Sequence, residues 1–237
     1  YEYDSFRGLK FGRRPQDATY NRIALLNEAI DAGFDGWLAF LDTDAFIVDL
    51  RFDLDAYLRR HDDRALVLRP SAPGAQDAWR VNAGVLFVNS RHPLAVRAMR
   101  AWRRLMSVAR MTGQLALPPR YALIDDQKLL QFHLMLNPAL RRATHYEDPL
   151  LINGAEASFI AHYLLSDVPD LDMRVAMIAA RIGRAFAAAG LDPAVERALS
   201  MNLSKALRAF APSRAISGPS VGTAQPWPGS SRCRAVR

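Results

Sequence analysis

The apolar residues of this chain follow two spacings, one typical of helices and one typical of strands. Between residues 20 and 32 they recur every three or four positions, which predicts an amphipathic helix that Thr19 caps and Gly33 ends. Residues 36–41 instead form a short continuous apolar run that includes two aromatic side chains, which predicts a buried strand. Alternation of such segments is typical of an α/β protein.

The same alternation continues to about residue 165. Helices are predicted over 54–60, 93–110 and 125–136, and further apolar segments lie at 45–48, 65–68, 81–88, 150–154 and 159–164. Ser90 and Pro93 are suited to cap and open the helix over 93–110. Its expected buried face consists of Leu94, Ala98, Ala101, Leu105 and Val108. We expect a mixed, mostly parallel sheet between helices.

The composition changes after residue 172. Two Ala-rich segments, 173–189 and 193–210, predict amphipathic helices without site chemistry. From residue 212 onward Pro, Gly, Ser and Arg dominate, which predicts a disordered tail. The expected organisation is therefore a main α/β domain over 1–170, a helical extension over 171–211 and a tail over 212–237.

Composition and charge limit the kind of protein. Of the 237 residues 50% are hydrophobic, enough for one substantial core, yet no apolar run reaches the roughly 18 residues of a membrane span. Without a signal-peptide pattern, and with Cys233 as the single cysteine, we expect a cytoplasmic protein. The net charge of +7 comes from 31 basic and 24 acidic residues, and the Arg pairs are scattered along the chain and not gathered in one block, which argues against a specific nucleic-acid site. Peripheral contact of the basic tail with membranes stays an alternative.

Two aspartates flank Thr43 directly after the predicted strand over 36–41. In an extended chain Asp42 and Asp44 leave the backbone on the same side. Two adjacent carboxylates repel each other unless a cation or a set of donors compensates them, and a divalent metal with a phosphate-bearing ligand would do so. The competing interpretation is a turn in which an aspartate accepts backbone hydrogen bonds.

Further motifs follow this pair in a fixed order. They are Asn82-Ala83-Gly84, Asp126-Gln127 and His162, and Asn21-Arg22-Ile23 precedes them. Together, over residues 1–165, the set resembles the metal-dependent nucleotide-sugar glycosyltransferases of the GT-A fold. The resemblance is closest to the galactosyl/mannosyl/xylosyl transferase family and its bacterial relatives. It implies a GT-A-like, Rossmann-like mixed sheet between helices.

The resemblance also implies a function for each motif. Asp42, Asp44 and His162 would hold Mn²⁺, with Mg²⁺ as the alternative ion. Asn82 and Gly84 would line the sugar and acceptor pocket, and Asp126 and Gln127 would lie near the acceptor. The implied reaction transfers a sugar from a nucleoside-diphosphate sugar to a hydroxyl of a saccharide or another acceptor. The family favours retention of configuration, and in an inverting enzyme Asp126 would be the candidate base.

The chain departs from the family pattern in two places. The family's first βα unit, which holds the base of the donor, would precede Tyr1, so we expect a truncated chain or a fold completed in another way. Many metal-dependent relatives also carry a Gly and a Lys after the histidine, and residues 163–167 contain neither. The diphosphate would then be bound by an arginine that the sequence does not identify.

Other interpretations stay open at the sequence level. Asp126 could cap a helix, Asn82 could hold a turn, Gly84 could mark a bulge and His162 could be a core histidine. The chain could be a non-catalytic nucleotide- or sugar-binding module. A haloacid-dehalogenase-type phosphatase is less consistent with the sequence, because Phe46 stands where that class has Thr or Val. The remaining histidines, among them His61 and His145, have no spacing that indicates a site.

Overall fold

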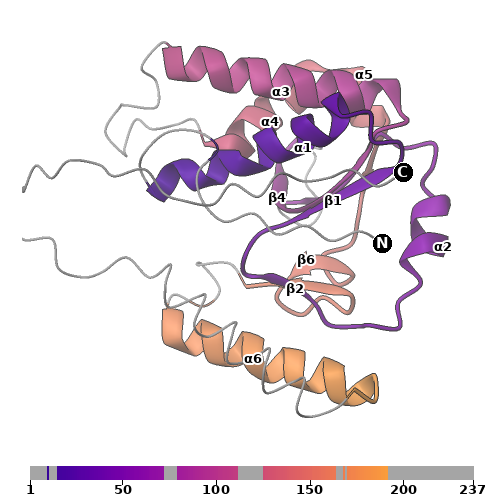
Figure 1. Ribbon diagram of the computed structural model, residues 1–237, viewed down its shortest axis with the longest axis vertical. Helices are drawn as coiled ribbons and strands as arrows, with labels where there is room; N and C mark the ends of the chain where they lie inside the picture. Colours follow the sequence, from indigo (N-terminus) through magenta and orange to yellow (C-terminus); the bar gives the residue numbers. More distant parts are fainter. Residues whose placement is uncertain are drawn as a thin grey trace, which may run out of the picture.

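The computed structural model describes residues 10, 15–71, 79–111, 125–163, 168 and 170–191 (Figure 1). The α-helices in this part of the chain are α1 (Asn21–Asp31), α2 (Leu54–Arg59), α3 (Pro93–Met111), α4 (Asp126–Leu136), α5 (Pro138–Arg142) and α6 (Leu171–Ala188), with a 3₁₀ helix at Pro15–Tyr20. The strands are β1 (Trp37–Leu41), β2 (Ala45–Ile47), β3 (Leu66–Pro70), β4 (Val81–Asn89), β5 (Thr144–Tyr146), β6 (Ile152–Gly154) and β7 (Ile160–His162).

These strands form two mixed sheets. The larger sheet has the order β1-β4-β3-β5 and the smaller one the order β2-β7-β6. Only β3–β5 and β6–β7 are parallel pairs among the described strands, so the expectation of a mostly parallel sheet is wrong. The connection between β3 and β4 explains part of this difference, because residues 71–80 are too few for the helical crossover that a parallel pair requires.

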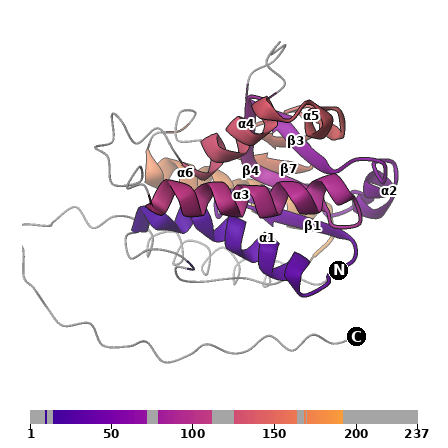
Figure 2. The same ribbon diagram turned by 90° about the horizontal axis from the view of Figure 1, so that it is seen from above.

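The elements stack in layers. Figures 1 and 2 show α1 and α3 side by side over one face of the larger sheet, with the smaller sheet on its other side and α6 beyond that. Successive side chains of β4 point to opposite faces of the larger sheet, which matches this arrangement. Leu86 and Val88 pack into the core below the helices, whereas Val85 and Phe87 pack into a second core with residues of the smaller sheet and α2.

The helix ends agree with the sequence predictions in part. Gly33 ends α1 with a positive φ of 81°, and Pro93 is the first residue of α3. The N-cap of α1 is Tyr20, not Thr19, and its side chain makes no capping hydrogen bond. Ser90 does not cap α3, because its hydroxyl bonds to backbone groups of Phe34 and Gly36 and thereby holds the turn before β1.

The buried face of α3 agrees only in part with the predicted one. Ala98 is buried as predicted, but Val108 is 51% exposed. The other fully buried positions include Ala95, Met99, Trp102 and Met106. The reason is Trp102, the largest fully buried side chain, whose indole Nε1 donates to the Asp126 carbonyl oxygen at 2.9 Å. This contact connects α3 to the start of α4.

Two predicted segments, the helix over 193–210 and the tail over 212–237, lie outside the described residues. Helix α5 and strand β5 were not predicted, and Asn137 explains α5, because its side-chain oxygen accepts from the Leu140 amide and caps it. No helix within the described ranges is both long and apolar enough to cross a membrane.

Candidate functional site

Three side chains from two segments far apart in the sequence converge where β1 ends. Asp42 follows β1, Asp44 precedes β2 and His162 is the last residue of β7. The antiparallel β2–β7 pair places Ala45 opposite His162 and so brings the imidazole beside the aspartates. One ligand atom from each residue lies within 4.8 Å of the other two. The predicted convergence of Asp42 and Asp44 is therefore present, and His162 joins them.

An irregularity in β4 makes room for this group. The register with β3 shifts between Leu68, which pairs with Leu86, and Arg69, which pairs with Asn82. The extra residues of β4 bulge out of the ladder, as often happens next to active sites. Within the bulge the Gly84 carbonyl oxygen accepts from the Asp42 amide at 2.8 Å. The interpretation of Gly84 as a bulge residue is confirmed.

Gly84 also lies against His162. A Cβ atom at position 84 would overlap both Cε1 and Nδ1 of the imidazole. The absence of a side chain therefore lets the histidine pack directly on the backbone of β4. His162 is only 4% exposed, so its ring is held from several sides.

The tautomer of His162 follows from Asn153. The Asn153 amide nitrogen donates to the carbonyl oxygen and to Oδ1 of Asn82, at 3.1 and 3.0 Å, which fixes the orientation of the amide. Its Oδ1 then faces Nδ1 of His162 at 2.7 Å, so Nδ1 carries a hydrogen. The other ring nitrogen, Nε2, faces Asp44 Oδ1 at 3.0 Å. This arrangement is usual for a metal-ligating histidine, in which the second nitrogen donates to a fixed acceptor.

Asn153 holds this position through an unusual backbone. Its φ is +62°, the single positive value among the described residues other than glycine. Asn tolerates this region better than most residues. The Asn153 carbonyl oxygen also accepts from Arg69 Nη1 at 2.7 Å, which connects β6 to the bulged end of β3.

Arg22 joins two acidic residues of the site. Its Nη2 lies 2.7 Å from Asp42 Oδ1, and its Nε lies 2.7 Å from Asp126 Oδ2. The same guanidinium donates to the carbonyl oxygen of Ala83 in the β4 bulge. Arg22 is 7% exposed by side chain and Asp126 is 5% exposed, so this is a buried network and not a surface ion pair.

Asp126 and Gln127 both make contacts inside the protein. Asp125 caps α4 by accepting from the Lys128 amide, which leaves Asp126 free to point inward at Arg22. The Gln127 side-chain oxygen accepts from the Ala83 amide at 3.0 Å. Both residues therefore fix the β4 bulge and the arginine beside it.

A second arginine reaches the site from α6. Arg174 Nη1 lies 3.2 Å from Asp44 Oδ2, and the side chain is 13% exposed. The segment over 173–189 was expected to carry no site chemistry, and that expectation is wrong for Arg174. Another arginine of the same helix, Arg181, donates to the carbonyl oxygens of Ala155 and Ala157 and attaches α6 to the loop after β6.

Burial and charge act differently on the two aspartates. Burial raises the pKa of Asp42, and the charge of Asp44 adds to this effect, while Arg22 and His162 offset it in part. Burial also opposes ionisation of Asp44, but its contacts with His162 and Arg174 outweigh this and lower its pKa. Burial raises the pKa of Asp126 to about 6 despite the Arg22 charge.

The donor set fits a divalent cation. Two carboxylates and one imidazole nitrogen are ligands that Mn²⁺ accepts, and Asn153 already holds His162 in the tautomer that leaves Nε2 free to coordinate. In this tautomer a neutral imidazole directs the lone pair of Nε2 at Asp44 Oδ1, and two acceptors at this distance repel each other. The contact therefore requires a proton or a metal ion between Nε2 and Oδ1.

Comparisons with known proteins do not assign the chain. No protein-family model matches it, and no curated protein does. The functional argument therefore depends on the sequence motifs and on the geometry of the residues that they contain.

Proposed function

We propose that this chain is a metal-dependent glycosyltransferase domain of GT-A type. It would transfer a sugar from a nucleoside-diphosphate sugar to an acceptor hydroxyl. The observation that carries the proposal is the convergence of Asp42 and Asp44, from the turn between β1 and β2, with His162, from the end of the distant strand β7. The order of the sequence motifs indicates the reaction class. The geometry supports it, because Asp42, Asp44 and His162 from these motifs lie close together.

The charge balance of the site supports a diphosphate ligand. Three carboxylates and two guanidiniums leave one net negative charge when all are ionised and His162 is neutral. A bound divalent cation would change this to one positive charge, which favours an anionic diphosphate. When bound, the cation would stabilise the negative charge that develops on the departing diphosphate.

Each residue then has a role in binding or orientation. Asp42, Asp44 and His162 would hold the cation, and Arg174 would contact the diphosphate in place of the Lys that the family pattern has after the histidine. Asn82 and Gly84, at the bulge, would border the sugar. In the reaction the bond from the anomeric carbon to the diphosphate oxygen breaks, a bond to the acceptor oxygen forms, and the acceptor proton is released.

Asp126 would position Arg22 and not act as a base. It is 3% exposed and its Oδ2 is paired with Arg22, so an acceptor hydroxyl has no direct approach to it. Through Arg22 it would orient Asp42 and the β4 bulge. This role agrees with retention of configuration, which needs no protein base at that position.

Turnover of a panel of UDP- and GDP-sugars tests the proposal. Release of nucleoside diphosphate would be measured with Mn²⁺ and with chelator for the wild type, Asp44→Asn and the control Asp49→Asn, which removes an exposed carboxylate five positions away. We expect Mn²⁺-dependent release by the wild type and the control, and a loss of about 100-fold or more in Asp44→Asn. Equal turnover in all three proteins would end the metal assignment.

A binding module that uses the same residues is the second candidate. The protein itself places a guanidinium beside each carboxylate, since Arg22 contacts Asp42 and Asp126, and Arg174 contacts Asp44. These pairs give the residues a role in binding that does not depend on catalysis. Calorimetry with the same nucleotides separates the candidates. Mn²⁺-dependent binding of a nucleotide sugar without its breakdown would favour the module.

A further inference from the structure

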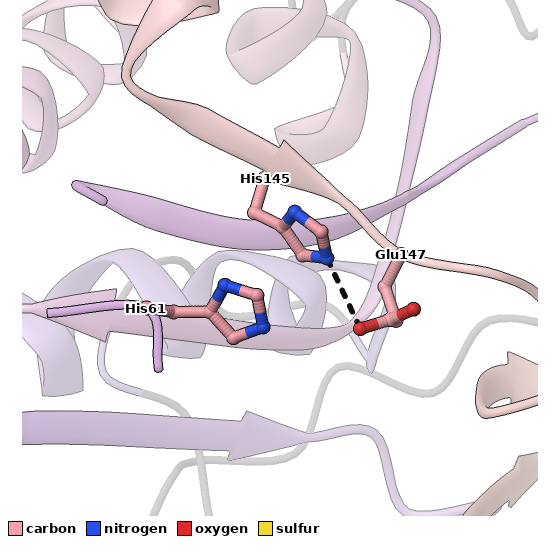
Figure 3. A group of neighbouring side chains, drawn as sticks. All are labelled: His61, His145 and Glu147. Carbon is pink, nitrogen blue, oxygen red and sulfur yellow. Dashed lines mark hydrogen bonds and ion pairs between the residues drawn. The ribbon is translucent and has the colours of Figure 1, made fainter. Parts of the chain in front are cut away.

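A second group of metal-ligand side chains lies away from the candidate site. Figure 3 shows His61 in the turn after α2, and His145 on β5 with Glu147 just beyond it. His145 and Glu147 are two positions apart on an extended segment, so their side chains share one face. The Glu147 amide continues the pairing with β3 through the Leu68 carbonyl oxygen. β5 is the edge strand of the larger sheet.

The three side chains approach one another closely. His145 Nε2 lies 3.1 Å from Glu147 Oε2, and one ligand atom of each residue lies within 4.8 Å of the others. The imidazole rings of His61 and His145 stack with centroids 4.1 Å apart. Tetrahedral zinc ligands at about 2.1 Å would lie roughly 3.5 Å from one another, so side-chain rotation alone can close the group around an ion.

The carboxylate is held by a neighbour that is itself buried. The Tyr57 hydroxyl donates to Glu147 Oε2 at 2.5 Å, and Tyr57 is 2% exposed. The ring of Tyr57 also contacts His61 edge-on, with centroids 4.8 Å apart. Such outer hydrogen bonds orient metal-ligating carboxylates and are part of most protein metal sites. The turn after α2 therefore provides one ligand, His61, and α2 itself provides Tyr57, which supports another.

We propose that His61, His145 and Glu147 form a second metal site that binds Zn²⁺ or a similar transition-metal ion and connects α2 to the edge strand β5. Two imidazoles and one carboxylate are a ligand set of zinc sites with three protein ligands, and solvent would take the fourth position. His145 is 32% exposed by side chain, which leaves the site open to solvent. This site is independent of the proposed transferase activity.

Zinc titration of the full chain tests the proposal. The Asp44→Asn variant serves as background, because it weakens the other candidate metal site. Four proteins would be compared: the Asp44→Asn background and this background with His61→Gln, Glu147→Gln or His133→Gln added. Calorimetry would measure zinc binding, and the visible spectrum of bound Co²⁺ would report the metal ligands. His133 lies on α4 and belongs to neither group, so its substitution is the matched control. Circular dichroism would verify that each variant is folded.

We expect the background and the His133→Gln protein to bind one Zn²⁺ and to melt at a higher temperature with zinc than without it. Adding His61→Gln or Glu147→Gln is expected to weaken zinc binding by about tenfold or more and to remove this thermal stabilisation. If Glu147→Gln unfolds the protein, His61→Gln decides, since its side chain is not held by Tyr57 through a hydrogen bond. Zinc affinity that is absent from the background, or unchanged by both substitutions, overturns the proposal.

Discussion

Arg174 Nη1 lies 3.2 Å from Asp44 Oδ2, although 130 positions separate the two residues. The contact brings α6, the helix that follows the main α/β layers in the chain, to the centre of the candidate site. The other oxygen of Asp44, Oδ1, lies 3.0 Å from His162 Nε2. Arg174 therefore lies beside Asp44 Oδ2, where its guanidinium would donate hydrogen bonds to an anionic ligand bound at the site.

Replacing Arg174 should separate donor binding from metal binding. In Arg174→Gln we expect the affinity for a nucleotide sugar to fall by roughly ten- to hundredfold, the range for a lost charged hydrogen bond. Mn²⁺ alone should bind as tightly as before or more tightly, because a positive charge next to Asp44 has been removed. Calorimetry measures both. Arg184→Gln, an exposed arginine of the same helix, is the control; equal weakening by both substitutions would contradict the role of Arg174.

Adding one methyl group at Gly84 should displace His162. The new Cβ would overlap Cε1 and Nδ1 of the imidazole, so Gly84→Ala is expected to lower the free energy of unfolding by about 1–3 kcal/mol and to weaken Mn²⁺ binding. Urea unfolding measures the first effect. The double variant Gly84→Ala/His162→Ala should lose less unfolding free energy than the sum of the losses in the two single variants, because the imidazole that overlaps the new Cβ is absent. Strict additivity would show that the two side chains do not compete for space.

Asn153 should control the tautomer of His162. Asn153→Gly keeps the positive φ and removes the acceptor of Nδ1, so backbone strain does not confuse the result. We expect Mn²⁺ affinity to fall by about ten- to hundredfold. In the wild type, nitrogen chemical shifts of His162 should report a hydrogen on Nδ1, and in the Gly variant a mixture of tautomers. An unchanged spectrum would mean that another contact fixes the ring.

The sequence predicts the parts of the site that depend on local pattern. Asp42 and Asp44 follow a strongly apolar strand as expected, but they lie in the turn between β1 and β2, where the Ala45 amide donates to the Asp42 carbonyl oxygen at 2.9 Å, and not in the extended chain from which their common direction was predicted. His162 was placed by family order, and the β2–β7 pairing gives the physical reason for its position. Gly84 and Asn82 were identified, although the bulge that they form comes from a register shift that no spacing shows.

The remaining contributors depend on tertiary packing. Arg174 reaches Asp44 only because α6 lies against the smaller sheet, and one arginine among several on an Ala-rich helix carries no local signal. Asn153 acts through a positive φ, which the sequence suggests only weakly. His145 lies on a three-residue strand that pairs in parallel with β3, so its approach to His61 could not be inferred from spacing.

Asp126 should make the stability of the protein depend on pH in the direction opposite to a usual aspartate. Its pKa is raised to about 6 in the folded protein, whereas an unfolded aspartate titrates near 3.9, so the folded state binds this proton more tightly. The contribution of Asp126 to stability is therefore present below about pH 4 and is lost as the pH rises through about 6.

The Asp126→Asn variant cannot gain or lose this proton. Relative to the variant, we expect the wild type to lose on the order of 2 kcal/mol of unfolding free energy between pH 4 and 7, measured by urea unfolding at a series of pH values. Asp125→Asn is the matched control, because it changes the neighbouring, solvent-accessible carboxylate and keeps an acceptor for the Lys128 amide. If the wild type and Asp126→Asn curves stay parallel over this range, the Arg22 charge outweighs burial and Asp126 is ionised throughout.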